Sequence, residues 1–130
     1  MEGSCNCKQV KFTTSENVKA ILNCHCNLCR KANGSAFSTY VVFLSSDFSL
    51  EKGTLKTVKI SENASKSFCC DCATPIFNEN PKYAGLKIVY LGALDKAQHL
   101  APVVDTYCES QLQWITQMDN LKKMEQGFGE

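Results

Sequence analysis

The 130-residue sequence predicts a mainly β single domain spanning residues 1–130, with metal-binding loops. Short runs rich in β-branched and aromatic residues recur along the chain, whereas helical periodicity is weak and confined to two segments. Neither an internal repeat nor a low-complexity linker divides the chain, and its length suits one domain with a modest core. Nine cysteines, most of them clustered, indicate metal binding in the loops.

The expected strands are short apolar or alternating runs with turn signals between them. The run 36–44 (AFSTYVVFL) is the strongest, because aromatic and β-branched residues fill it. The runs 9–12 (QVKF) and 54–60 (TLKTVKI) alternate apolar and polar residues, and the tripeptide 51–53 (EKG) indicates a turn before the second of them. The remaining strand candidates are 18–23 (VKAILN), 65–69 (SKSFC), 75–78 (PIFN), 86–92 (LKIVYLG) and 102–108 (PVVDTYC).

Two segments have weak helical character. One is 26–33 (CNLCRKAN), which lies inside a cysteine cluster. The other is the tail, 113–126, where the pair Asp-Asn at 119–120 interrupts the pattern. The apolar residues of the tail at near-helical spacing are Trp114, Ile115, Met118 and Leu121.

Charge and hydropathy argue against several classes of partner. A formal net charge of +1 gives no electrostatic case for nucleic acid or an anionic membrane surface. The longest apolar run, 40–44 (YVVFL), is far shorter than the roughly 20 residues of a membrane-spanning helix. The N-terminal MEGSCNCK has neither the basic nor the apolar part of a secretory signal, so we expect a cytoplasmic protein. The sequence leaves the oligomeric state open.

Seven of the nine cysteines fall into three clusters. Disulfides are disfavoured in a reducing compartment, so clustered cysteines favour metal binding there. Sulfurs that share a tetrahedral zinc ion lie about 3.8 Å apart, from a Zn–S distance of about 2.3 Å, and a C-x-x-C turn or a C-x-C pair on a strand can reach that separation. The clusters are Cys5-x-Cys7, Cys24-x-Cys26-x-x-Cys29 and Cys69-x-x-Cys72.

Two plus two plus three ligands make one closed four-cysteine site and one three-cysteine site. The three cysteines of 24–29 can hold one ion within a single short loop. The economical partition therefore joins the pair 5/7 to the pair 69/72, which ties the N-terminus to the middle of the chain. A structural zinc ion there would contribute on the order of 10 kcal/mol to folding. Spacing alone also allows the pair 5/7 to share an ion with the 24–29 loop.

The remaining cysteines and the histidines have simpler expected roles. Cys70 and Cys108 have no cluster partner, and we expect them to pack as small apolar residues. His25 is the nearest candidate for a fourth ligand of the 24–29 loop. Its place between two ligand cysteines favours a role in supporting the ligands or in facing the substrate over direct coordination. His99 follows LDKAQ in an apparent loop, where we expect it to be exposed.

Five motifs, in order, resemble those of the glutathione-dependent formaldehyde-activating enzyme and centromere protein V family. The resemblance runs from about Gly3 to Trp114, and the tail 115–130 continues it. Two departures stand out: Ala73 follows the last cluster where glycine is usual, and 105–106 (Asp-Thr) precedes YCES where His-Ile is frequent. The motifs are GSCNCKQVKF, CHCNLCRKANGSAFSTYVVF, SFCCDCATPIF, VYLGALD and YCESQLQW.

This resemblance implies a β-tent architecture similar to that of a Rab-exchange chaperone, with two zinc ions per chain. It implies a carbon–sulfur lyase that adds glutathione to formaldehyde and gives S-hydroxymethylglutathione. The cysteines at 24, 26 and 29 would then form the catalytic site. The structural ion would be held by Cys5, Cys7, Cys69 and Cys72.

An open three-thiolate site fits that chemistry. The sulfur of glutathione would take the fourth position, lose its proton and attack the carbonyl carbon of a small aldehyde. Three thiolates make the ion electron-rich, which favours thiolate delivery over Lewis-acid polarisation of the carbonyl. Arg30 and Lys31, together with His25, are the expected contacts for glutathione, because the two cations suit its carboxylates.

Two other classes of function compete with the enzyme. A zinc-stabilised binding or scaffold module would have a protein ligand that closes the second site. A redox sensor would use the C-x-x-C of Cys26 and Cys29, which can oxidise reversibly.

Overall fold

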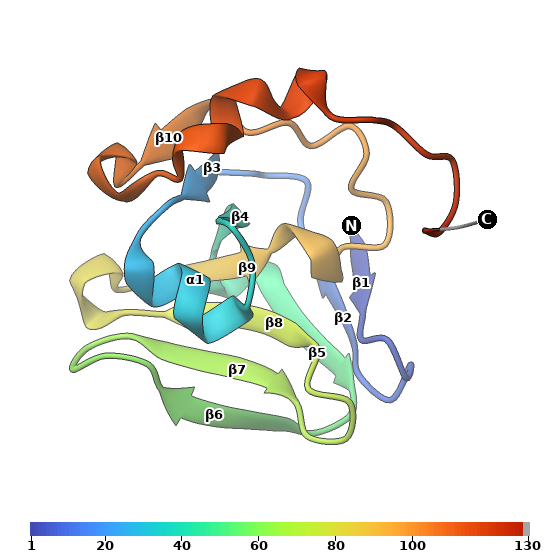
Figure 1. Cartoon of the computed structure of the whole chain (residues 1–130). Helices are drawn as coiled ribbons and strands as arrows, with labels where there is room; N and C mark the ends of the chain where they lie inside the picture. Colours follow the sequence, from blue (N-terminus) through green and yellow to red (C-terminus); the bar gives the residue numbers. More distant parts are fainter. Residues whose placement is uncertain (129–130) are drawn as a thin grey trace.

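The structure is a computed structural model that describes residues 1–128, and the expectation of a mainly β fold is confirmed (Figure 1). The strands are β1 (Glu2–Ser4), β2 (Lys11–Thr14), β3 (Ala20–Cys24), β4 (Ser38–Leu44), β5 (Phe48–Lys52), β6 (Leu55–Lys59), β7 (Ser65–Cys69), β8 (Pro75–Glu79), β9 (Leu86–Tyr90) and β10 (Val104–Thr106). The α-helix is α1 (Asn27–Asn33), and the 3-10 helices are η1 (Ser45–Asp47), η2 (Pro81–Tyr83), η3 (Leu91–Ala93), η4 (Cys108–Ser110) and η5 (Gln113–Asn120).

The strands form two sheets. The smaller sheet has the order β1-β2-β5 and is antiparallel. The larger has the order β10-β3-β4-β9-β8-β7-β6 and is antiparallel except for its edge, where β10 runs parallel to β3. Sequential neighbours pair for most of the larger sheet. The late strand β9 inserts between β4 and β8, so the three strands are held side by side.

Strand β4 has a buried residue on both of its faces, which places it between two clusters. Val41 and Phe43 belong to the main core, where the side chains of the two sheets meet. Tyr40, one position away in the pleat, belongs to a second cluster with Tyr90, Cys24 and Cys29. The largest fully buried apolar side chains of the main core are Phe12, Phe43, Ile76, Val10, Val41 and Val89.

Several expected boundaries differ from the structure. Strands β1 and β5 were not expected, and the turn expected at 51–53 is wrong in part, because Glu51 and Lys52 end β5 and the turn begins at Gly53 (φ 95°). The strand expected at 102–108 is shorter, since β10 is followed by η4. The tail forms 3-10 helix η5, with a break at Gln117, instead of an α-helix.

The C-terminal segment (residues 103–110) closes the β3 end of the larger sheet (Figure 1). The backbone N–H of Val103 donates to the carbonyl of Ile21, and the N–H of His25 donates to the carbonyl of Thr106, both over 3.0 Å. The segment therefore lies against the loop that carries the second cysteine cluster. Within residues 1–128, no helix has the length and apolar character needed to cross a membrane.

Candidate metal centres

The first centre brings together two cysteine pairs that lie more than 60 positions apart in the chain. The four Sγ atoms all lie within 4.8 Å of one another. The Sγ atoms of Cys5 and Cys7 are 3.6 Å apart, and those of Cys7 and Cys69 are 3.8 Å apart. These separations match the edge of a tetrahedron of sulfurs around zinc, about 3.8 Å. The group of four is Cys5, Cys7, Cys69 and Cys72, which is the economical partition, not the sharing of the pair 5/7 with the 24–29 loop.

Two tight turns present these sulfurs. The residue after each pair, Lys8 (φ 67°) or Ala73 (φ 65°), is in the left-handed region. That conformation favours glycine, which explains why glycine is usual at the position of Ala73. Backbone N–H groups point at the sulfurs, as suits thiolates: Val10 N–H donates to Cys5 Sγ at 3.1 Å. The hydroxyl of Thr74, 3.1 Å from the sulfur of Cys72, is the largest cause that lowers the pKa of this thiol to about 5.

The second centre lies where β3 passes into α1. Cys24 ends β3, Cys26 is the N-cap of α1, and Cys29 lies in the helix. Their Sγ atoms all lie within 4.8 Å of one another, and those of Cys24 and Cys29 are 3.4 Å apart. The sulfur of Cys26 accepts from the N–H of Cys29 at 3.2 Å, so it caps the helix. The donated hydrogen bond from Cys29 lowers the pKa of Cys24 to about 5 and raises the pKa of Cys29.

Both centres fit a metal ion in their donor chemistry. Each gathers thiols at chelating distances, and hydrogen bonds favour the thiolate form of Cys72, through Thr74, and of Cys24, through Cys29. The first offers four sulfurs and the second three. Among the described residues, no further His, Cys, Asp or Glu joins the second group.

His25 is one of the most buried polar side chains of the described residues, with 1% of its surface exposed. Its Nε2 lies 2.8 Å from Oδ1 of Asp105, and its ring packs on Phe37 with centroids 5.0 Å apart. Its Nδ1 is buried with no hydrogen-bond partner. The hydrogen bond from His25 lowers the pKa of Asp105. His25 thus lies outside the group of sulfurs and joins the second centre to β10.

Asp105 and Thr106 stand where His-Ile is frequent in the family that the sequence resembles. Both make contacts that the sequence did not predict. Oδ1 of Asp105 also accepts from Nδ2 of Asn23 at 3.1 Å, and the hydroxyl of Thr106 donates to the carbonyl of Asn23 at 2.9 Å. Both residues therefore fasten β10 to the strand that leads into the cysteine loop.

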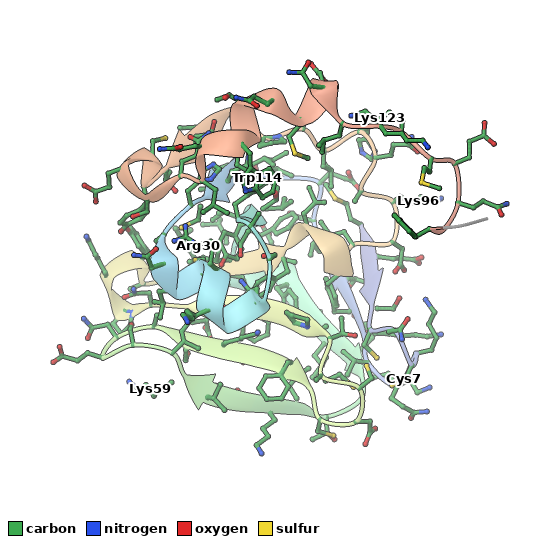
Figure 2. The ribbon with its side chains drawn as sticks, viewed as in Figure 1. Cys7, Arg30, Lys59, Lys96, Trp114 and Lys123 are labelled. Atoms are coloured by element: carbon green, nitrogen blue, oxygen red, sulfur yellow. The ribbon has the colours of Figure 1, made fainter. Side chains whose placement is uncertain are left out.

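Arg30 holds the second centre to the C-terminal segment. Its Nη1 donates to the carbonyl of His25 at 3.0 Å and to that of Ser110 at 2.7 Å, and its Nη2 donates to Asn27. Figure 2 shows Arg30 on α1 beneath the C-terminal segment, with Cys7 at the opposite side of the molecule. Lys31 is exposed on the same helix. The two centres are thus separate, and the cations predicted for glutathione lie beside the second.

The second centre also has polar neighbours that sequence reasoning missed. Oη of Tyr40 lies 3.2 Å from Sγ of Cys29, and this hydroxyl contacts Asn78, which in turn contacts Tyr90. Burial raises the pKa of Tyr40 and raises that of Tyr90 to about 12, so both stay protonated. Lys66 donates to the carbonyl of Ala32 at 2.6 Å, and burial lowers its pKa. Side chains alternate between the two faces of a strand, so Tyr40, next to the core residue Val41, lies on the opposite face of β4. This alternation is the sequence signal that could have identified Tyr40.

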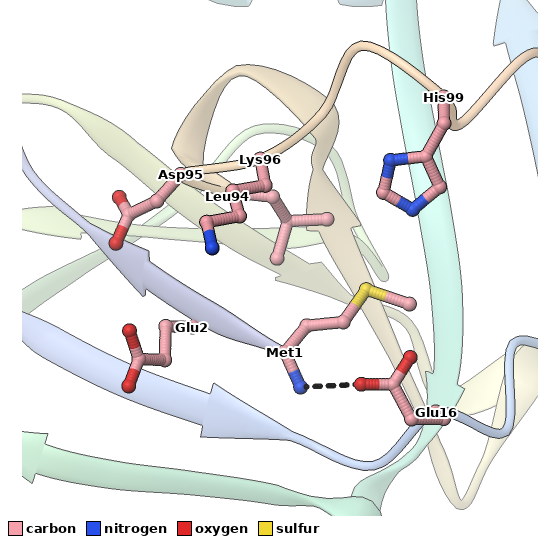
Figure 3. Close-up of a pocket in the computed structure, with 7 residues that line it drawn as sticks. All are labelled: Met1, Glu2, Glu16, Leu94, Asp95, Lys96 and His99. Atoms are coloured by element: carbon pink, nitrogen blue, oxygen red, sulfur yellow. Dashed lines mark hydrogen bonds and ion pairs between the residues drawn. The ribbon is translucent and has the colours of Figure 1, made fainter.

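Outside the two groups, the expectation for His99 is confirmed, whereas that for the two remaining cysteines is wrong. Cys70 and Cys108 are exposed, so their expected role in packing is wrong: Cys70 lies in the turn after β7, and Cys108 begins η4. His99 is exposed, as expected. It lines a cavity of about 370 Å³ that contains no cysteine, where the amino group of Met1 pairs with Glu16 at 3.3 Å (Figure 3). The other residues that line this cavity are Glu2, Leu94, Asp95 and Lys96.

Comparison with known proteins identifies the family. Residues 1–110 match the family model described as glutathione-dependent formaldehyde-activating enzyme. The structure is similar to the crystal structure of a protein from Rhodobacter sphaeroides, with a TM-score of 0.67 and 20% sequence identity, over 82% of this chain and 100% of that one. None of the curated proteins compared matches the chain. At that identity the likeness shows the fold alone, whereas the match to the family model covers most of the sequence. The chain therefore belongs to the family of glutathione-dependent formaldehyde-activating enzymes.

Proposed function

We propose that the chain is a zinc-dependent carbon–sulfur lyase that joins glutathione to formaldehyde or a similarly small aldehyde. The observation that carries the proposal is the group of three sulfurs at the second centre, because three protein ligands are the usual number at a catalytic zinc ion. The first centre, with four sulfurs, would hold a structural ion. We further propose that the protein acts in the cytoplasm, where its thiols stay reduced.

A zinc ion held by Cys24, Cys26 and Cys29 would supply an open position at which the sulfur of glutathione is stabilised as a thiolate. The sulfur forms a bond to the carbonyl carbon, and the π electrons of the carbonyl move to oxygen. The oxygen then takes up one proton, which balances the proton that the thiol lost. The product is the S-hydroxymethyl thiohemiacetal, and nothing is oxidised or reduced.

The residues beside the second centre would hold the rest of glutathione. Lys31 is exposed and free to reach a carboxylate. Arg30 has five N–H donors, of which three serve the contacts to His25, Ser110 and Asn27, so two remain for substrate. His25 would have a positioning role. Its hydrogen bond to Asp105 holds the ring in place, and His25 thereby sets the path of the backbone between two of the cysteines.

Exchange NMR with glutathione and formaldehyde tests the proposal. The uncatalysed reaction interconverts free glutathione and its adduct, and the zinc-loaded protein should speed this exchange. Cys26→Ser removes one ligand of the second centre and should return the exchange to the uncatalysed rate. Cys70→Ser changes an exposed cysteine outside both centres, so it is the matched control and should behave as the parent.

The alternative is a zinc-stabilised binding or scaffold module without catalysis. A parent protein with two bound ions and no effect on the exchange rate would favour that reading over the enzyme. So would a fourth protein ligand at the second centre in the loaded protein.

A further inference from the structure

Three polar side chains are buried together on the face of the larger sheet that carries the second centre. Tyr40 on β4, Asn78 on β8 and Tyr90 on β9 are 4%, 7% and 7% exposed. Tyr40 is paired directly with Tyr90 across the strands, and Asn78 lies one strand further. Burying such groups costs free energy unless they are hydrogen-bonded, so the partners of each decide its role.

The hydrogen bonds of this trio have a definite direction. The hydroxyl of Tyr90 donates to Oδ1 of Asn78 at 2.7 Å, which leaves the amide nitrogen of Asn78 to face Tyr40. That nitrogen donates to Oη of Tyr40 at 3.3 Å. The oxygen of Tyr40 is therefore an acceptor from Asn78, and its own proton remains to be donated. This oxygen also lies 3.2 Å from Sγ of Cys29, which is an acceptor once the thiol has ionised.

We propose that Tyr40 is a positioning residue of the second centre, whose hydroxyl donates a hydrogen bond to the thiolate of Cys29 and is aimed there by Asn78 and Tyr90. The inference rests on the proposed function, because it requires that the three sulfurs hold a metal ion. It adds a role for a residue outside the group of ligands.

The consequence for the centre follows from the charge on the sulfur. Three thiolates make a bound ion electron-rich, and a donor to one of them withdraws part of that charge. The ion is left better able to hold a fourth, anionic ligand such as the thiolate of glutathione. Partners of this kind around a metal site typically change metal affinity or activity by about 10–100-fold.

Cobalt titration of the full chain tests the proposal. The second equivalent reports the three-sulfur centre through its sulfur-to-cobalt charge-transfer absorption. In Tyr40→Phe the thiolate of Cys29 loses its donor, so this absorption should move to longer wavelength and the second equivalent should bind about 10-fold more weakly. Tyr83→Phe removes the hydroxyl of an exposed tyrosine on η2, and its titration should match the parent.

A second pair of variants keeps the test independent of folding. Tyr40→Phe leaves the buried amide of Asn78 without its acceptor, which itself costs stability. Asn78→Leu and the double variant Tyr40→Phe/Asn78→Leu both lack that amide and differ from each other in the hydroxyl alone. The absorption should differ between these two in the same direction as between Tyr40→Phe and the parent.

Two results would overturn the inference, and they are distinguishable. If the parent takes up a second cobalt ion and neither pair of proteins differs in spectrum or affinity, Tyr40 does not act on Cys29, while the proposed function stands. If the parent takes up only one ion, the proposed function and this inference fail together.

Discussion

Replacing Cys72 by serine should destabilise the whole protein, because it removes one of the four ligands that link the N-terminal turn to the turn after β7. The sulfurs of Cys7 and Cys69 lie 3.8 Å apart across 62 positions of sequence, and Cys72 completes their group. A serine hydroxyl is a poor substitute for thiolate as a zinc ligand. The variant should therefore lose much of the affinity of the first centre and the folding free energy that it supplies.

The expected loss can be worked out from the number of ligands. A structural zinc ion contributes on the order of 10 kcal/mol to folding, and loss of one ligand of four removes at least a quarter of that, about 2.5 kcal/mol. With an unfolding entropy of about 2.1 cal/mol/K per residue, a chain of this length loses about 4 °C in Tm per kcal/mol. Cys72→Ser should thus lower Tm by at least about 10 °C.

Cys26→Ser is the informative comparison. Cys26 caps α1 by accepting from the N–H of Cys29, and serine is itself a favoured N-cap, so its oxygen can keep that contact. The second centre also lies outside the main core. This variant should stay within about 4 °C of the parent and lose activity.

Thermal unfolding of zinc-loaded parent, Cys72→Ser and Cys26→Ser, each checked for zinc content, measures the difference. Cys70→Ser, an exposed cysteine in neither centre, controls for loss of a thiol as such. Equal falls in Tm for Cys72→Ser and Cys26→Ser would refute the division into a structural and a catalytic centre.

Three further expectations follow from the contacts around the centres. A mild chelator should remove the ion of the 24–29 loop first and leave the fold intact, because three sulfurs hold it instead of four; sequential loss in circular dichroism and zinc release would check this, and freshly reduced protein with less than one zinc per chain would contradict it. Ala73→Gly should raise Tm by up to about 6 °C, since the left-handed conformation costs alanine roughly 1–2 kcal/mol and glycine loses about 0.4–1 kcal/mol of that gain to chain entropy; a lower Tm would contradict it. Asp105→Ala should speed hydrogen exchange at the backbone N–H of His25, which donates to Thr106, and unchanged protection there would show that the side-chain pair does not hold β10 in place.

Most of the larger sheet could be predicted from the sequence because its strands have strong local patterns. The run 36–44 contains β4, and the run 65–69 coincides with β7. The grouping of the cysteines was also predictable, since three clusters with chelating spacing leave few partitions. Local pattern and ligand number together therefore favoured both candidate centres, although spacing alone also allowed the pair 5/7 to share an ion with the 24–29 loop.

The parts that sequence did not predict depend on long-range contacts. Strand β1 has only three residues, too few for a recognisable pattern. Its middle residue is Gly3, where a side chain would collide with the ring of Phe12, a contact with another strand. Strand β5 has four exposed residues among its five and only two apolar residues, Phe48 and Leu50, so its alternation is too short to identify a strand. The contact of His25 with Asp105 spans 80 positions, and no local pattern reports such a pair.

The most direct test of the central proposal is whether the sulfur of glutathione binds at the second centre. Cobalt-loaded protein should change its visible absorption when glutathione is added, because a fourth sulfur joins the ion. Binding should tighten as pH rises toward the pKa of the free thiol, since ligation releases a proton. S-methylglutathione keeps both carboxylates but cannot form a thiolate, so it should bind much more weakly and leave the charge-transfer absorption unchanged. Equal binding of the two compounds, or a cobalt spectrum that does not respond to glutathione, would contradict thiolate delivery by this centre.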